Sequence, residues 1–113
     1  MSFNKLEVAE KKAVREAMLT ILNDNLIDDL EFETRLGVGR RDLAAIINSY
    51  PNIDDVRQDS RESVSINNCL NELCFGVKAP AQVWTRIGVS KEELLDIYRK
   101  WAGLRGWKST GIR

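Results

Sequence analysis

The sequence predicts an all-α fold of about six helices in two tandem, pseudo-equivalent units, and three observations support this. Apolar residues recur at the spacing i, i+3, i+4, i+7 that marks the buried face of a helix. The alternation of apolar and polar residues that marks a strand is not seen. The chain also aligns with itself at a shift of 51 residues, which places residues 17–50 over 68–101 with eight identities among 34 positions. About two identities are expected from average residue usage.

The aligned units share one motif, Thr34–Val38 (TRLGV) in the first and Thr85–Val89 (TRIGV) in the second. Each unit is therefore predicted as a helix, a loop, a short helix that carries the Thr-Arg pair, a glycine turn and a closing helix. We expect a single domain over residues 1–113, because a chain of this length can bury one sufficient core.

The first unit covers about residues 4–50, and its opening helix is predicted from about Asn4 to Asn25. Its closing helix is expected to end before Pro51, which cannot continue a helix. Gly39 stands where a capping side chain would be, so this helix lacks a cap at its start. The buried stripe of the closing helix is predicted to be Leu43, Ile46, Ile47 and Tyr50.

The second unit covers about residues 62–103, and its opening helix is predicted from about Glu62 to Phe75. Gly76 is placed to end that helix. Ser90 and Glu93 form a capping box at the start of the closing helix. The buried stripe of the closing helix is predicted to be Leu94, Ile97, Tyr98 and Trp101.

Two further segments complete the predicted organisation. A polar linker, residues 51–61, joins the units. A basic tail, residues 104–113, has little periodicity and is expected to lie outside the core. Gly103 is expected to end the last helix before this tail.

The sequence disfavours binding to nucleic acid, a membrane span and a disulfide bond. Seventeen basic and seventeen acidic side chains cancel, whereas proteins that bind phosphate backbones usually carry an excess of Lys and Arg. No apolar stretch is long enough for a signal peptide or a membrane span. Cys69 and Cys74 fall on different faces of one predicted helix, so they are expected to be free thiols, as in a reducing compartment. A cytoplasmic location is therefore expected.

The sequence also offers little for catalysis. It contains no histidine, the commonest general base and metal ligand. A Gly-rich phosphate loop and a nucleophile elbow are not found. The two cysteines have no histidine or second cysteine pair to complete a zinc site. We therefore expect no enzymatic activity, no metal and no cofactor, and interpret the protein as a binding module.

The segment from Asp24 to Glu33 (DNLIDDLEFE) holds five carboxylates and no basic residue. Its spacing is not that of a calcium loop, and it lacks the required glycine. Two interpretations remain open. The acids can be a solvated loop and helix start, where they favour the helix dipole, or a negative patch that binds a basic partner. In the second case the partner-binding residues are Asp24, Asp28, Asp29, Glu31 and Glu33.

The duplicated Thr-Arg pair is interpreted as structural. Arg35 and Arg86 each precede a turn glycine, where a guanidinium can bond carbonyls at the helix end or an acid in the other unit. Trp84 takes the place of Glu33 in the self-alignment. Because one of these two equivalent positions is expected to be exposed, Trp84 is a candidate anchor at an interface.

An alternative function is that of a small helix-turn-helix-like DNA-binding regulator. The segment Val83–Trp101 has a short helix, a glycine turn and a capped second helix, as such motifs do. However, Trp84 stands where these motifs carry a small residue, and the second helix begins with acidic side chains that suit phosphates poorly. Arg40 and Arg41 of the first unit are better placed for phosphates. Nucleic acid is the less favoured partner.

The segments Asn68–Gly76 (NCLNELCFG) and Trp84–Val89 (WTRIGV) resemble a pattern in small bacterial all-helical proteins. Some of these are similar to immunity proteins of contact-dependent growth inhibition and other polymorphic toxin systems. The resemblance covers roughly the second unit and, more loosely, the first. It implies a cytosolic protein that neutralises a cognate toxin domain, often a nuclease, and whose gene directly follows the toxin gene. It transfers no binding residue, because the matching positions look structural.

Overall fold

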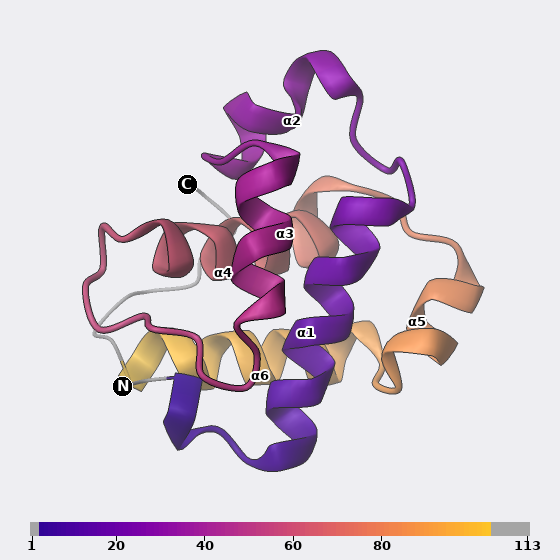
Figure 1. Ribbon diagram of the computed structural model, residues 1–113. Helices are drawn as coiled ribbons and strands as arrows, with labels where there is room; N and C mark the ends of the chain where they lie inside the picture. Colours follow the sequence, from indigo (N-terminus) through magenta and orange to yellow (C-terminus); the bar gives the residue numbers. More distant parts are fainter. Residues whose placement is uncertain (1–2, 105–113) are drawn as a thin grey trace.

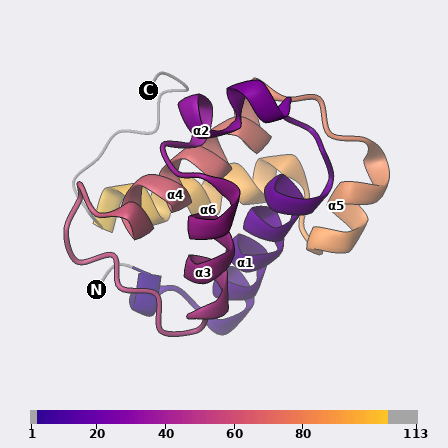
Figure 2. The ribbon, with the colours of Figure 1, turned by 45° about the horizontal axis from the view of Figure 1, so that its top comes forward.

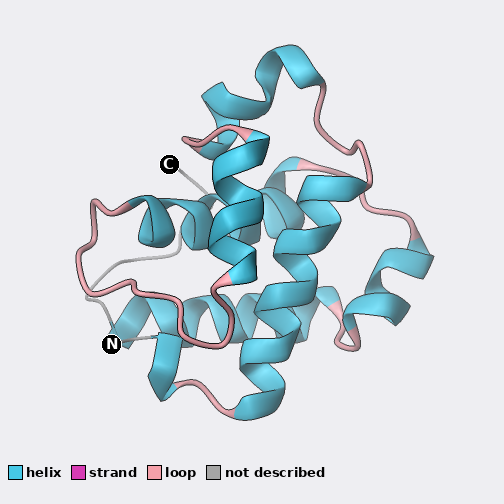
Figure 3. Ribbon diagram, in the orientation of Figure 1, coloured by secondary structure: helices cyan, strands magenta, loops and turns pink. Residues whose placement is uncertain are grey.

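The computed structural model describes residues 3–104, and all regular secondary structure among them is helical. A 3-10 turn, Phe3–Lys5, is followed by α1 (Val8–Asn23), α2 (Asp29–Leu36) and α3 (Arg40–Asn48). In the second half, α4 (Arg61–Asn71) runs into a π-helical turn, Glu72–Gly76, and α5 (Ala81–Ile87) and α6 (Lys91–Leu104) follow. The prediction of an all-α fold with about six helices is confirmed (Figure 3).

The helices are arranged in two crossing layers around α1. In Figure 1, α1 and α3 lie side by side at the front, and α4 and α6 cross behind them. Helix α1 contacts α3, α4, α5 and α6, which places it at the centre of the fold. Helices α2 and α5 lie at the periphery, and they are apart from each other in Figure 1 and in the turned view of Figure 2. Among the residues described, no helix is long and apolar enough to span a membrane.

The core is built from the predicted apolar stripes. Leu43 of α3 and Leu94 of α6 are fully buried, and Trp101, the largest core side chain, is fully buried as well. Tyr50, the last member of the first stripe, is only partly buried and packs at the edge of the core. The other stripe residues in the closing helices are all buried, namely Ile46, Ile47, Ile97 and Tyr98.

Both halves of the chain contain the same order of elements. Helices α1, α2 and α3 in the first half correspond to α4, α5 and α6 in the second, and each short helix ends at a glycine. Gly37 has a φ of 78° and Gly88 a φ of 88°, a left-handed conformation that glycine adopts without a Cβ clash. The predicted capping box at Ser90 and Glu93 is formed. The superposition of residues 17–50 on 68–101 stays a prediction.

Three helix boundaries differ from the predicted ones. The opening helix is interrupted at Leu6, because Glu7 and Glu10 form a capping box that starts α1 at the next residue. The second opening helix changes to a π-helical turn at Glu72. Helix α6 continues through Gly103 to Leu104, since one glycine within a helix costs only about 1 kcal/mol relative to alanine.

The predicted polar linker, residues 51–61, is anchored in the core. Ile53 and Asp55 are fully buried. The Oδ2 atom of Asp55 accepts hydrogen bonds from the Phe3 amide at 3.0 Å and from Trp101 Nε1 at 2.8 Å. The linker therefore ties the start of the chain to the last helix. Of the predicted basic tail, residues 105–113 lie outside the described residues.

The two turn glycines provide a matched test of packing between the halves. A Cβ on Gly37 would lie 2.7 Å from Val64 Cγ1, whereas a Cβ on Gly88 would meet no atom within 4 Å. In both alanine variants the free energy of unfolding should fall by about 1 kcal/mol, because alanine is strained in the left-handed conformation. For Gly37→Ala the free energy of unfolding should fall by about 1–2 kcal/mol more, because Val64 must move. Urea unfolding measures both losses, and equal values would contradict this account of Gly37.

Candidate functional site

The Thr-Arg arginine of the first half forms an ion pair with a buried carboxylate of the second half. Glu72 is fully buried at the start of the π-helical turn. Arg35 Nε donates to Glu72 Oε2 at 3.2 Å, and Arg35 Nη2 pairs with Oε1. The hydrogen bond to Glu72 is the main cause that raises the pKa of Arg35. A Cβ on Gly76 would overlap Glu72 Oε1, so a glycine at the end of this turn leaves room for the carboxylate.

The arginine of the second half makes the reciprocal contact. Arg86 Nη2 donates to Asp24 Oδ2 at 2.6 Å and to Thr20 Oγ1 at 3.0 Å, at the end of α1. Each arginine therefore reaches the end of the opening helix of the other half. Of the two expected arrangements, bonds to carbonyls at the helix end or to an acid in the other unit, the structure shows the acid for both arginines. These ion pairs connect the two halves.

Three of the five acids proposed as partner-binding residues are engaged within the chain. Asp24 pairs with Arg86. Asp28 caps α2 and accepts a hydrogen bond from the Leu30 amide at 3.5 Å. Asp29 Oδ1 pairs with Arg40 Nη2 at 2.7 Å. These three carboxylates are therefore less available to a partner than the sequence predicts.

The other two acids, Glu31 and Glu33, are exposed on α2. Leu30, which directly precedes Glu31 on the same short helix, is 91% exposed. We call Leu30, Glu31 and Glu33 the α2 surface. An apolar side chain with a charged surround is the arrangement of an interface anchor and its polar rim. A pocket of about 290 Å³ adjoins this surface and is lined by Asp29, Phe32, Glu33, Gly39 and Arg40.

Trp84 lies on α5, away from the α2 surface (Figure 1). Its side chain is half-buried and packs against the core. With Val89, Glu93 and neighbouring residues it lines a pocket of about 350 Å³ at the start of α6. The structure therefore places Trp84 beside a different carboxylate, Glu93, and does not bring it together with Glu31 and Glu33.

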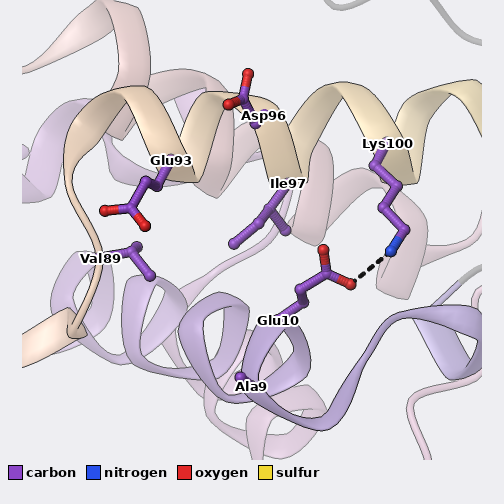
Figure 4. A pocket seen from close by; sticks show the side chains of 7 residues that line it. All are labelled: Ala9, Glu10, Val89, Glu93, Asp96, Ile97 and Lys100. Atoms are coloured by element: carbon purple, nitrogen blue, oxygen red, sulfur yellow. Dashed lines mark hydrogen bonds and ion pairs between the residues drawn. The ribbon is translucent and has the colours of Figure 1, made fainter.

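A larger pocket, of about 420 Å³, adjoins the Trp84 pocket and shares Val89 and Glu93 with it. It lies between the beginning of α1 and the first three turns of α6 (Figure 4). We call it the α1–α6 groove. Its lining residues are Ala9, Glu10, Val89, Glu93, Asp96, Ile97 and Lys100.

The starts of two helices place carboxylates in the α1–α6 groove. Glu10 Oε1 accepts hydrogen bonds from the Glu7 amide and from Lys100 Nζ, both at 2.8 Å. Glu93 Oε1 accepts a hydrogen bond from the Ser90 amide at 3.0 Å. The bond from Lys100 is the main cause that lowers the pKa of Glu10, and the bond from the Ser90 backbone lowers the pKa of Glu93. Both glutamates are therefore ionised at neutral pH.

The cysteines are buried and free of a disulfide. Burial raises the pKa of both thiols, that of Cys74 to about 11, so neither is a thiolate nucleophile at neutral pH. Within the described part of the chain, no three His, Cys, Asp or Glu side chains are grouped so that they could hold a metal ion.

Sequence reasoning missed the two fully buried carboxylates, Asp55 and Glu72. A signal for Glu72 was present, because in the self-alignment it takes the place of Ile21, a residue of the predicted core stripe. Asp55 gave no such signal within the polar linker. The α1–α6 groove was missed because its two walls come from opposite ends of the chain.

Comparisons with known proteins do not assign the chain to a family. The sequence matches no family model, and comparisons with curated proteins and with solved structures give no match. What the protein does is therefore inferred from its own residues.

Proposed function

We propose that the protein is a non-catalytic binding protein, an immunity protein that neutralises a cognate basic toxin domain by direct contact through the α2 surface. The toxin domain would be of a class that handles phosphates, such as a nuclease, because these enzymes present basic clefts to hold their substrates. The proposed place of action is the cytoplasm, and no cofactor is required.

Leu30 is the observation that carries this proposal. Leu30 is 91% exposed. Its burial against an apolar surface of a partner would contribute about 1.5–3 kcal/mol of favourable free energy. Helix α2 lies at the periphery of the fold, where a partner can reach it (Figure 1). Leu30 is therefore well suited to be the anchor of an interface.

The two exposed glutamates support a basic partner. Glu31 and Glu33 add negative charge around Leu30, and such charge raises the rate of encounter with a basic surface. Asp28 and Asp29 contribute to the same field, although one caps α2 and the other pairs with Arg40. The α2 surface therefore combines an apolar anchor with steering charges.

The DNA-binding alternative is supported less well. Arg40 and Arg41 were the better-placed phosphate ligands on the sequence. The Arg40 guanidinium donates to Leu22 O at 2.6 Å, pairs with Asp29 and lies 4.1 Å above the Phe32 ring, whereas Arg41 is exposed. In the second half, Glu92, Glu93 and Asp96 are exposed near the start of α6. These carboxylates would repel a phosphate backbone.

Growth protection tests the proposed function. The product of the gene directly upstream is expressed from an inducible promoter, with and without this protein. The wild-type protein should restore growth. The variant Leu30→Ala/Glu31→Gln/Glu33→Gln should lose protection and keep its thermal transition, because all three side chains are exposed.

A matched control is Val56→Ala/Glu92→Gln, which changes an exposed valine and an exposed glutamate away from α2 and should protect as well as wild type. An upstream product that is not toxic, or is toxic in the presence of the wild-type protein, would contradict the immunity function. A salt-sensitive shift of DNA by the purified protein would favour the regulator instead.

A further inference from the structure

The α1–α6 groove is a second surface with the features of a binding site. Its floor is apolar, formed by Ala9, Val89 and Ile97, and charged side chains surround it. With a volume of about 420 Å³ it falls within the range of pockets that hold a small ligand or a side chain. It is separate from the α2 surface and shares no residue with it.

The charges around the groove do not balance. Glu10 forms an ion pair with Lys100 at 2.8 Å, which leaves Glu93 and Asp96 as the excess negative charges of the lining. Figure 4 shows Ile97 and Lys100 extending from α6 toward α1 and Glu93 extending toward Val89, whereas Asp96 points from α6 away from α1. The Glu10 and Glu93 carboxylates are held in place by the capping boxes of α1 and α6. Of the two excess charges, that of Glu93 is therefore held in place by the backbone at the start of α6.

We propose that the α1–α6 groove is a docking site for a basic side chain of a protein partner. The aliphatic stem of the side chain lies on Val89 and Ile97, and its cationic head reaches Glu93, while Asp96 adds negative charge at the edge of the groove. Arginine and lysine combine such a stem and head, with the stem on apolar surface and the charge toward water. Trp84, in the adjoining pocket, extends the apolar floor for the neighbouring residues of the partner.

The test uses N-acetyl-arginine amide as the probe and N-acetyl-citrulline amide as its neutral counterpart of the same shape. The full-length protein is labelled with nitrogen-15 and titrated by NMR. The arginine probe should give saturable shifts centred on Val89, Glu93 and Ile97, with a dissociation constant of about 1–10 mM, as expected for one side chain. Citrulline should bind at least about fivefold more weakly, because it lacks the charge.

The variant Glu93→Gln/Asp96→Asn should weaken arginine binding by about fivefold or more. Glutamine also serves at the third position of a capping box, so the start of α6 is retained, and the dispersion of the NMR spectrum reports on the fold. The matched control, Glu31→Gln/Glu33→Gln, removes two charges from the α2 surface and should leave the arginine titration unchanged.

Three results would overturn the docking site: equal binding of citrulline, arginine shifts spread over all acidic regions without saturation, and unchanged binding by Glu93→Gln/Asp96→Asn. The site does not depend on the proposed toxin. Loss of growth protection by the α2 variant leaves this titration unaffected, and failure of the titration leaves the protection experiment unaffected.

Discussion

Leu94→Asp and Leu43→Asp should each be severely destabilising. Both leucines are fully buried, and an aspartate in either place would put a charge into apolar surroundings and remove a large core side chain. The expected loss is about 4 kcal/mol or more, which approaches the total stability of about 5–15 kcal/mol of a typical domain. Thermal unfolding followed by circular dichroism measures the effect.

The control for these variants is Leu30→Asp. The substitution is chemically the same, but Leu30 is 91% exposed, so its thermal transition should lie close to that of wild type. A normal transition for either core variant would show that the apolar stripe of that closing helix is wrongly assigned. The comparison therefore separates burial from any general effect of an added charge.

Arg35→Ala should cost several times more stability than Arg86→Ala, although the two arginines occupy equivalent places in the self-alignment. Arg35 faces Glu72, whose side chain has no exposed surface, whereas Arg86 is about half exposed and pairs with a partly exposed Asp24. Removal of the partner of a buried charge costs about 3 kcal/mol or more. An exposed ion pair is worth about 1 kcal/mol or less.

Urea unfolding of the two arginine variants measures this difference. The double substitution Arg35→Met/Glu72→Met should recover part of the loss of Arg35→Ala, because it removes both charges together. Equal losses for Arg35→Ala and Arg86→Ala would mean that the buried carboxylate does not depend on Arg35.

The local features of the fold could be predicted because they depend on residues close in sequence. The spacing of Leu43, Ile46 and Ile47 identified the buried face of α3, and the pair Ser90 and Glu93 identified the start of α6. The self-alignment also identified the two turn glycines. Capping and amphipathic periodicity act within one or two turns, so the sequence alone contains them.

The features that the sequence did not predict depend on contacts between distant segments. The buried carboxylate of Glu72 is paired with Arg35, which approaches it from the other half, and the π-helical turn accompanies that ion pair. The burial of Asp55 requires the Phe3 amide and Trp101. The same is true of the candidate sites, since the packing of α1 against α6 creates the groove that Glu10 and Glu93 line.

The acidic segment Asp24–Glu33 was predicted in part and missed in part. Its charge predicted a partner-binding patch, but the sequence could not show that Asp24 and Asp29 would be engaged by Arg86 and Arg40. It also gave no reason to select Leu30, because the exposed fraction of a leucine depends on where its helix lies in the fold. The candidate binding site on the acidic segment is thus reduced from five acids to the α2 surface, which contains two of them and Leu30.

The rate of association with the product of the upstream gene tests the central claim most directly. Stopped-flow measurements would compare the wild-type protein with Leu30→Ala/Glu31→Gln/Glu33→Gln at about 20 mM and about 200 mM salt, on either side of the concentration where the Debye length is about 10 Å. If the α2 surface binds a basic toxin, the variant should associate about tenfold more slowly at low salt, and the difference should shrink at high salt. Equal rates at low salt, with tight binding by both proteins, would show that the partner contacts another face of the molecule.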